Sequence, residues 1–208
     1  MGSVKDLLIQ KEPTRQELGL GTFVFSDRYS VFDWGEMPDL ISKKGEVLAM
    51  MGGYNFELLE ENGIRTHYRG MMEDGDTVKV GALDSPSSEI SIRLAHKPEV
   101  EALDKGYRYE DLSSRKNFLI PLEIVFRNYI PKGSSIRRRY GPDEIGLDSK
   151  EWPGKEIELD RPMVEFSTKL ERQDRYLDRD KAFDISGLDE EEFANLEEIA
   201  ASVNRYLT

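Results

Sequence analysis

The chain has 208 residues, a formal net charge of -12 and no cysteine. This length allows one domain or two small lobes, and no stretch approaches the roughly 20 apolar residues that a membrane helix needs. The N-terminus lacks the apolar core of a signal peptide, and a chain without cysteine has neither disulfides nor thiolate metal sites. The acidic balance argues against general nucleic-acid binding, which needs a basic surface. A reducing, cytoplasmic setting is the simplest interpretation.

The N-terminal half predicts short strands around one helix. Residues 21–25 alternate in polarity, as a half-buried strand does. Residues 44–62 predict a helix, because they carry an apolar stripe at helical spacing and because Asn62-Gly63 is a typical C-terminal stop. The stripe consists of Val47, Met51, Tyr54 and Leu58. Shorter strands separated by polar turns are expected at 66–70, 77–81 and 89–94.

The C-terminal half begins after a polar, poorly periodic segment, where we expect a boundary between lobes 1–112 and 113–208. Residues 118–126 are apolar and β-branched, and they predict a buried strand that stops at an arginine. A long loop or hairpin follows at 137–161. The last element is a helix with Asp189 as N-cap and Glu192 completing a capping box. Its apolar stripe is Phe193, Leu196, Ala200, Val203 and Leu207.

A basic cluster follows the strand at 118–126 in this otherwise acidic chain. Its charged members are Arg127, Lys132, Arg137, Arg138 and Arg139. Between them lie Gly133, which has no Cβ to keep a ligand from the backbone amides, and two serine hydroxyls, Ser134 and Ser135. Such groups suit an anionic, phosphorylated small molecule. The alternative is a solvated surface patch paired with Asp143 and Glu144.

One motif in this region is long and specific. The segment Ile120-Pro-Leu-Glu-Ile-Val-Phe-Arg-Asn-Tyr129, followed by Gly133-Ser134, resembles the signature of the SAICAR synthetases, the phosphoribosylaminoimidazole-succinocarboxamide synthases. In that family a run like Ile-Pro-Leu-Glu-Val-Val-Val-Arg-Asn-Tyr precedes Gly-Ser and basic residues. Further segments resemble the family in the same order along the chain. They are 2–7, 27–33, 43–45, 58–67 and 165–169.

The resemblance implies an α+β, two-lobed, ATP-grasp-like fold with antiparallel sheets. It implies an ATP- and Mg²⁺-dependent ligase of purine biosynthesis, with a nucleotide-binding N-terminal lobe and a substrate and ATP lobe after it. Such an enzyme activates the carboxylate of carboxyaminoimidazole ribonucleotide (CAIR) as an acyl phosphate, which the amine of L-aspartate attacks to give SAICAR, ADP and phosphate. This chemistry depends on positioning and charge neutralisation.

The resemblance also implies roles for individual residues. The ribonucleotide would be bound by Asp27, Ser30, Arg127, Gly133, Ser134 and Arg138, with its 5′-phosphate on Arg127 and Ser134. Lys5 and Glu123 would bind the cofactor. Asp33, Lys169 and Asp178 are the expected catalytic residues, and Asp33 would also approach the magnesium. We do not assign His67 as a base, because a lone histidine at a strand start is more often structural.

Each of these residues also has a structural interpretation. Asp27 and Ser30 could be turn and cap residues after a strand. Arg127 could pair with Glu123, which lies on the same face of the strand. Lys5, so close to the N-terminus, could be solvated.

The sequence departs from the family pattern in three places. Ser3 stands where the family has a lysine, and the spacing between Arg127 and Ser134 is one residue longer than in many members of the family. The family's later carboxylates that hold magnesium-ATP have no match before Thr208. The alternatives are therefore a truncated chain, one subunit of a split enzyme whose partner supplies the missing strands, or a non-catalytic ribonucleotide-binding paralogue. A homo-oligomer is a further possibility.

Overall fold

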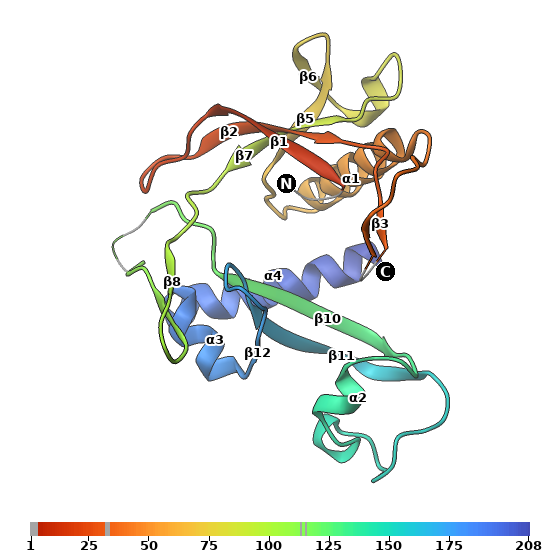
Figure 1. The fold of residues 1–208 in the computed structure, drawn as a ribbon, viewed down its shortest axis with the longest axis vertical. Helices are drawn as coiled ribbons and strands as arrows, with labels where there is room; N and C mark the ends of the chain where they lie inside the picture. The colour runs from red at the N-terminus through yellow and green to blue at the C-terminus, as the bar shows by residue number, and fades with distance from the viewer. Residues whose placement is uncertain (1–3, 32–33, 113, 115) are drawn as a thin grey trace. The chain divides into compact units, whose positions relative to one another are not determined.

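The computed structural model describes residues 4–31, 34–112, 114 and 116–208 (Figure 1). By its internal contacts the chain forms two compact units. Unit 1 comprises Met1–Ile120 together with Ser202–Thr208, and unit 2 comprises Pro121–Ala201. The division falls eight residues after the 112/113 boundary expected from the sequence. In the described part of the chain, no helix is long and apolar enough to cross a membrane.

Unit 1 is built on a five-stranded antiparallel sheet with the strand order β1-β2-β7-β5-β6. Its strands are β1 (Lys5–Lys11), β2 (Gly19–Phe25), β5 (Tyr68–Glu73), β6 (Asp76–Val78) and β7 (Glu89–Leu94). The long helix α1 (Lys44–Glu61) lies along one face of the sheet (Figure 1). Between helix and sheet the core consists of Ala49, Tyr68, Met71, Ile90 and Ile92.

The bounds predicted for this helix are confirmed, but its apolar stripe is not its buried face. Val47, Met51 and Tyr54 are 53%, 59% and 60% exposed. The face against the sheet is made largely of small residues, such as Gly45 and Gly53. A Cβ at Gly53 would lie 2.6 Å from the sulfur of Met71, and one at Gly45 would lie 2.7 Å from a backbone oxygen. At Gly45 and Gly53 the helix lies so close to its neighbours that no larger side chain fits there.

The shorter elements of unit 1 connect these layers. They are β3 (Ser30–Val31), β4 (Gly35–Glu36), the 3₁₀ turn η2 (Val80–Ala82), β8 (Val100–Ala102) and β9 (Tyr107–Tyr109). β3 pairs with β4 and β8 pairs with β9. The β8–β9 hairpin lies in the segment for which the sequence predicted no strand. Strands of three residues are too short to give a periodic pattern of apolar residues.

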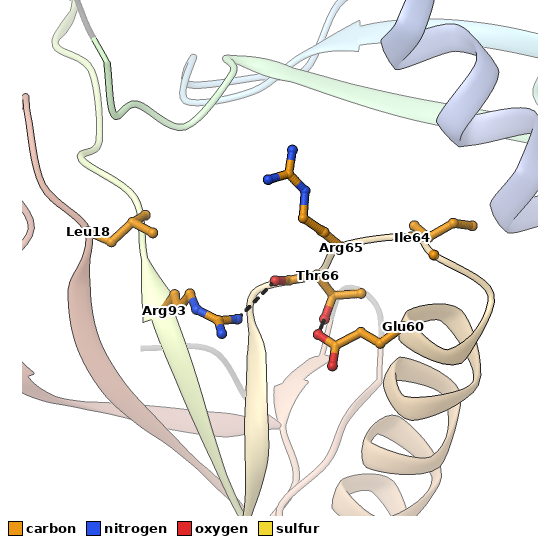
Figure 2. A pocket seen from close by; sticks show the side chains of 7 residues that line it. Leu18, Glu60, Ile64, Arg65, Thr66 and Arg93 are labelled. Carbon is orange, nitrogen blue, oxygen red and sulfur yellow. Dashed lines mark hydrogen bonds between the residues drawn. The ribbon is translucent and has the colours of Figure 1, made fainter.

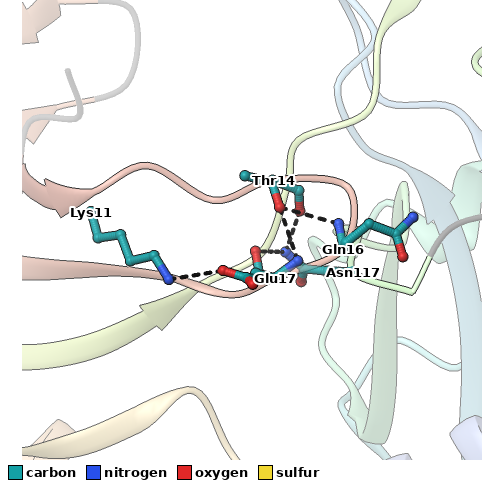
Figure 3. A network of polar contacts seen from close by, with 5 residues as sticks. All are labelled: Lys11, Thr14, Gln16, Glu17 and Asn117. Atoms are coloured by element: carbon teal, nitrogen blue, oxygen red, sulfur yellow. Dashed lines mark hydrogen bonds and ion pairs between the residues drawn. The ribbon is translucent and has the colours of Figure 1, made fainter.

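A buried asparagine ties the turn between β1 and β2 to the segment that precedes unit 2 (Figure 3). The Nδ2 of Asn117 donates to the carbonyl oxygens of Thr14 and Glu17, at 2.8 and 2.7 Å. Glu17 also forms an ion pair with Lys11, 3.1 Å between Nζ and Oε2. The Asn117 side chain thus satisfies two carbonyl groups in the turn, which fixes its conformation.

Unit 2 contains a three-stranded antiparallel sheet with the order β10-β11-β12. The strands are β10 (Leu122–Ile130), β11 (Ile157–Thr168) and β12 (Tyr176–Leu177). The other elements are α2 (Ile136–Arg139), the turn η3 (Asp143–Ile145), α3 (Arg179–Ser186) and α4 (Glu190–Leu207), whose residues from Ser202 onward are grouped with unit 1. The predicted strand at 118–126 is wrong in both bounds. It begins only after Pro121, and Arg127 does not end it, because that side chain has a partner on the neighbouring strand.

The sheet of unit 2 has one apolar face, which carries the core. Leu122, Ile124 and Leu177 pack there with Phe166, and the helices α3 and α4 cover them with Ala182, Phe183 and Phe193. The predicted capping box is confirmed at the start of α4, since Glu192 N donates to Asp189 Oδ1 at 2.8 Å and Asp189 N donates to Glu192 Oε2 at 3.0 Å. Both helices pack on this apolar face of the sheet. The opposite face carries polar side chains of the strands.

Candidate functional site

The opposite face of the unit 2 sheet gathers charged and aromatic side chains. Alternation along β10 places Glu123 and Arg127 on this face. The strand register sets Ser167 opposite Glu123, Glu165 opposite Val125, and Tyr176 opposite Ser167. We call the set Glu123, Arg127, Glu165, Ser167 and Tyr176 the polar face. The face is thus assembled from all three strands, and residues far apart in sequence meet on it.

Glu165 is the centre of the polar face. Its side chain is only 3% exposed, and its two oxygens accept hydrogen bonds from Arg127 Nε and Arg139 Nη1. Burial alone would raise the pKa of the Glu165 carboxyl, but the hydrogen bonds and charges of the two arginines outweigh it and hold the pKa below its usual value. Glu165 is therefore ionised at neutral pH and bridges two cations.

Arg139 reaches this carboxylate from the short helix α2. The centre of its guanidinium lies 3.4 Å from the ring centroid of Tyr176, so the side chain is held between an aromatic face and a carboxylate. Two of its nitrogens, Nε and Nη2, are buried and have no hydrogen-bond acceptor among the described residues. Arg139 is thus fixed by Glu165 and Tyr176 together.

The other two consecutive arginines have different surroundings. Arg137 donates to three backbone carbonyls, those of Pro153, Ile130 and Lys155, and so fastens the loop that follows α2. Arg138, the arginine expected to bind substrate, is exposed to solvent. The three adjacent arginines of this single helical turn thus point in different directions. Arg137 contacts the loop, Arg138 faces solvent and Arg139 reaches the polar face.

The turn expected to bind phosphate lies directly between β10 and α2. Ser134 N donates to the carbonyl of Pro131 at 3.1 Å, and the Ser134 hydroxyl accepts from Ile136 N at 3.4 Å. A Cβ at Gly133 would meet nothing within 4 Å. The described neighbours therefore give no steric reason for a glycine here, whereas a ligand close to the backbone would give one.

Glu123 and Lys169, expected to bind cofactor and to act in catalysis, lie together at the opposite end of the sheet from the turn. Lys169 Nζ lies 3.5 Å from Glu123 Oε1, and both side chains are about half exposed at 45% and 48%. Asp178, also expected to act in catalysis, is the N-cap of helix α3. Its carboxylate accepts from Lys181 N at 2.9 Å, and the hydrogen bond from the Lys181 side chain, followed by that from the backbone amide, lowers the pKa of Asp178.

Two predicted site residues of unit 1, Asp27 and Ser30, lie in the described part of the chain near the start of α1 and in β3. Asp27 accepts from Gly45 N with Oδ1 at 2.9 Å and from Lys43 N with Oδ2 at 3.1 Å, so both oxygens bind the start of α1. Ser30 lies in the exposed strand β3, opposite Glu36. Asp33 lies outside the described residues. These two hydrogen bonds support the interpretation of Asp27 as a helix-capping residue.

Lys5 and His67 share an aromatic cluster in unit 1. Lys5 Nζ lies 3.8 Å from the ring centroid of Phe23, and burial lowers the pKa of this lysine. His67 packs edge-on against Phe56, with 4.9 Å between ring centroids. Burial, and then the charges of Lys5 and Arg93, lower the pKa of His67, which is therefore neutral at pH 7. The packing of His67 agrees with a structural role.

Unit 1 also contains an open cavity of about 630 Å³ at the C-terminal end of α1 (Figure 2). It is lined by Leu18, Glu60, Gly63, Ile64, Arg65, Thr66 and Arg93. Thr66 donates to Glu60 at 2.8 Å, and Arg93 donates to the Thr66 carbonyl at 3.4 Å, while Arg65 extends away from these contacts (Figure 2). The acidic Glu60 and the negative end of the helix dipole offset the positive charge of the arginines in this cavity.

Two residues of the polar face, Glu165 and Tyr176, were missed as candidates in the sequence, and Arg139 was expected only as one member of the basic cluster. One signal was available for Glu165, since it stands at the start of the short run Glu165-Phe-Ser-Thr168 at the end of a strand, and a carboxylate that is buried there requires a cationic partner. Nothing in the sequence distinguishes Arg139 from Arg138, because the difference is set by the orientation of a helix of four residues.

The described residues do not form a ready-made cluster of metal ligands. No group of three or more His, Asp or Glu side chains is close enough there to hold a metal ion. On the polar face Glu165 is already bound by two arginines and Glu123 by Lys169. The described residues thus fit a phosphorylated ligand better than they fit a metal ion.

The α+β fold with antiparallel sheets is that of SAICAR synthetases of known structure. A SAICAR synthetase (Type-2) in complex with ADP matches all of this chain and 65% of its own, at a TM-score of 0.62 and 22% identity. A SAICAR-synthase from Saccharomyces cerevisiae complexed with SAICAR matches 99% of this chain and 60% of its own, at a TM-score of 0.61 and 21% identity. At these identities the comparison establishes the fold.

The chain belongs to the SAICAR synthetase family, whose model matches residues 2–208. A relative from Archaeoglobus fulgidus, described as a putative phosphoribosylaminoimidazole-succinocarboxamide synthase, is 46% identical over 216 residues, covering all of this chain. A phosphoribosylaminoimidazole-succinocarboxamide synthase from Thermoplasma acidophilum is 32% identical over 188 residues, which cover 89% of this chain. The matches span 62% and 55% of the lengths of these two relatives. The family expected from the sequence motifs is thus confirmed.

Proposed function

We propose that this chain carries the ribonucleotide-phosphate site of an ATP-dependent ligase that joins L-aspartate to the carboxylate of CAIR and releases SAICAR, ADP and phosphate. Family membership supports the reaction class. Two structures of the same fold support the ligands, since one is in complex with ADP and the other is complexed with SAICAR. A cytoplasmic location and assembly into homo-oligomers stay predictions from the sequence.

The observation that carries the proposal is the position of Arg127. Its guanidinium is 21% exposed on the polar face, in the strand that leads into the turn containing Gly133 and Ser134. A guanidinium has five N–H donors, and the contact with Glu165 uses the one on Nε. The remaining donors match the oxygens of a phosphate monoester. In the proposed complex Arg127 and Ser134 bind the 5′-phosphate, and Gly133 allows that phosphate to approach the backbone.

The chain's own residues act by binding and orientation. Anchoring the phosphate at one end of the polar face fixes the direction of the ribonucleotide, which is the contribution expected for acyl and phosphoryl transfer. Lys169, beside Glu123 at the other end of the sheet, is the cation we assign to the reacting groups. ATP, when bound, supplies the phosphoryl group that activates the substrate carboxylate. Because the described residues contain no metal cluster, we derive no step through magnesium.

Calorimetry with CAIR and with SAICAR tests the phosphate site directly. We expect Arg127→Ala to weaken both ligands by about 1.5–3 kcal/mol, or roughly 10- to 150-fold in Kd, while ATP affinity stays nearly unchanged. Arg108→Ala is the control, because Arg108 is an exposed arginine of unit 1 that pairs with the exposed Glu101. Unchanged CAIR and SAICAR affinity in Arg127→Ala would overturn the site.

An ADP-release assay with ATP, Mg²⁺, CAIR and L-aspartate tests the reaction. SAICAR formation that requires all four components, detected by mass spectrometry, would support the ligase activity for this chain. Binding of CAIR without turnover would leave the phosphate site standing and overturn the activity of the 208-residue chain by itself.

A further inference from the structure

Glu165 has an arrangement that a surface salt bridge does not require. The carboxylate is buried beneath the polar face, and each of its oxygens is bound to a different arginine. Arg139 is held in turn by the ring of Tyr176, which comes from the neighbouring strand β12. The contacts therefore run without interruption from Tyr176 through Arg139 and Glu165 to Arg127.

We propose that Glu165 is a positioning residue for the anionic ligand, which fixes the guanidinium of Arg127 on the polar face with the help of Arg139. This inference rests on the proposed phosphate-binding function of Arg127. An arginine side chain has many rotamers, and a ligand that must order it loses affinity. Glu165 orders Arg127 before the ligand arrives. The hydrogen bond that Glu165 accepts comes from Nε, so it does not use the N–H donors of the two outer nitrogens of Arg127.

The charges show why Arg139 is needed in this arrangement. A carboxylate next to a phosphate site repels the ligand, and Glu165 by itself would cancel the charge of Arg127. The second arginine restores a net charge of about +1 to the three groups, from two cations and one anion. The buried nitrogens of Arg139 are not available to a ligand, so its effect on binding passes through Glu165.

Charge and positioning predict opposite results for one substitution. Glu165→Gln removes the negative charge and keeps the shape of the side chain. If Glu165 only reduced the positive charge of the site, this variant would bind SAICAR more tightly. If Glu165 holds Arg127, the variant binds more weakly, because a neutral amide is a poorer acceptor for a guanidinium. We expect SAICAR affinity, measured by calorimetry at low salt, to fall roughly 5- to 50-fold.

A charge-matched double variant separates the two effects further. Glu165→Gln combined with Arg139→Gln has the same net charge as the original three groups, but Arg127 is no longer held by a carboxylate. We expect this variant to bind SAICAR as weakly as Glu165→Gln does. It also removes both buried charges together, which a fold tolerates better than the loss of one partner. Circular dichroism checks whether each variant folds. If Glu165→Gln alone does not fold, the double variant still provides a SAICAR affinity with which to test the inference.

The outcomes distinguish this inference from the proposed function. Wild-type affinity in the double variant, or tighter binding in Glu165→Gln, would overturn the positioning role. If Arg127→Ala leaves SAICAR affinity unchanged, the phosphate site itself fails. In an active preparation, Glu165→Gln should raise the KM for CAIR and change kcat little, since the effect is on binding. A fall in kcat with unchanged KM would contradict the inference.

Discussion

Two carboxylates of this chain, Asp27 in unit 1 and Glu165 in unit 2, have both oxygens bound, but to different kinds of donor. Asp27 accepts from two backbone N–H groups at the start of α1. Glu165 accepts from two guanidinium groups. A backbone N–H has one hydrogen to give, whereas each guanidinium keeps donors beyond the one that the carboxylate uses. The comparison separates a carboxylate that completes a fold from one that can prepare a binding site.

The same comparison explains why residue type alone is a poor guide to function here. Asp27 was expected in the substrate pocket, and its described contacts are those of a helix cap. Glu165 belongs to the family-like segment 165–169 without a predicted role, and its carboxylate binds both arginines of the charged face of unit 2. What decides the difference is the partner, and the partner follows from the strand register and from the approach of α2.

The largest expected effect concerns the loss of Glu165. Glu165→Ala leaves two partly buried guanidinium groups without their shared carboxylate, and we expect the free energy of unfolding to fall by about 3–5 kcal/mol. Urea unfolding followed by tryptophan fluorescence can measure this, because Trp34 is already 84% exposed and Trp152 lies in unit 2 beside Arg137.

Glu123→Ala is the matched control on the same face. Glu123 is paired with Lys169 at 3.5 Å but is half exposed, and such pairs contribute about 0–1 kcal/mol. Equal destabilisation by the two substitutions would contradict the larger contribution to stability that we expect from the buried Glu165.

The pH dependence of stability sharpens the same point. Because the arginines lower the pKa of Glu165 in the folded chain, its ionised form contributes stability above the ordinary carboxyl pKa. That contribution is lost as the pH falls through the lower, folded value. Wild-type stability should therefore decline between about pH 5 and pH 3 more steeply than that of Glu165→Gln. Parallel pH profiles in urea titrations would show that Glu165 is not the group responsible.

The sequence carried enough information to identify the family, the helix at 44–62 and the capping box of α4, because each depends on neighbouring residues along the chain. It also placed Arg127 on the charged face. It did not give the buried side of α1, because the closeness of the helix to the sheet decides that side. Nor did it give the bridge from Arg139 to Glu165, which depends on a contact between residues 26 positions apart.

The start of α1 offers a prediction of intermediate size. A Cβ at Gly45 would lie 2.7 Å from the carbonyl oxygen of Phe25, and this backbone atom cannot move aside easily. We expect Gly45→Ala to destabilise unit 1 by about 1–3 kcal/mol. Gly52→Ala is the control in the same helix, because its Cβ would have an ordinary contact of 3.6 Å with Ile90. That substitution should stabilise the helix by about 0.5–1 kcal/mol. Hydrogen exchange of the α1 amides measures both.

The smallest expected effect tests the other carboxylate of the comparison. Asp27→Ala removes the acceptor for Lys43 N and Gly45 N, and we expect a loss of about 0.5–2 kcal/mol, typical of a helix cap. Asp27→Asn keeps one acceptor oxygen and should lose less. Faster hydrogen exchange confined to the first turn of α1, with unchanged SAICAR affinity, would establish the cap role. A large fall in SAICAR affinity without faster exchange would instead return Asp27 to the substrate site, and both carboxylates would then serve the ligand.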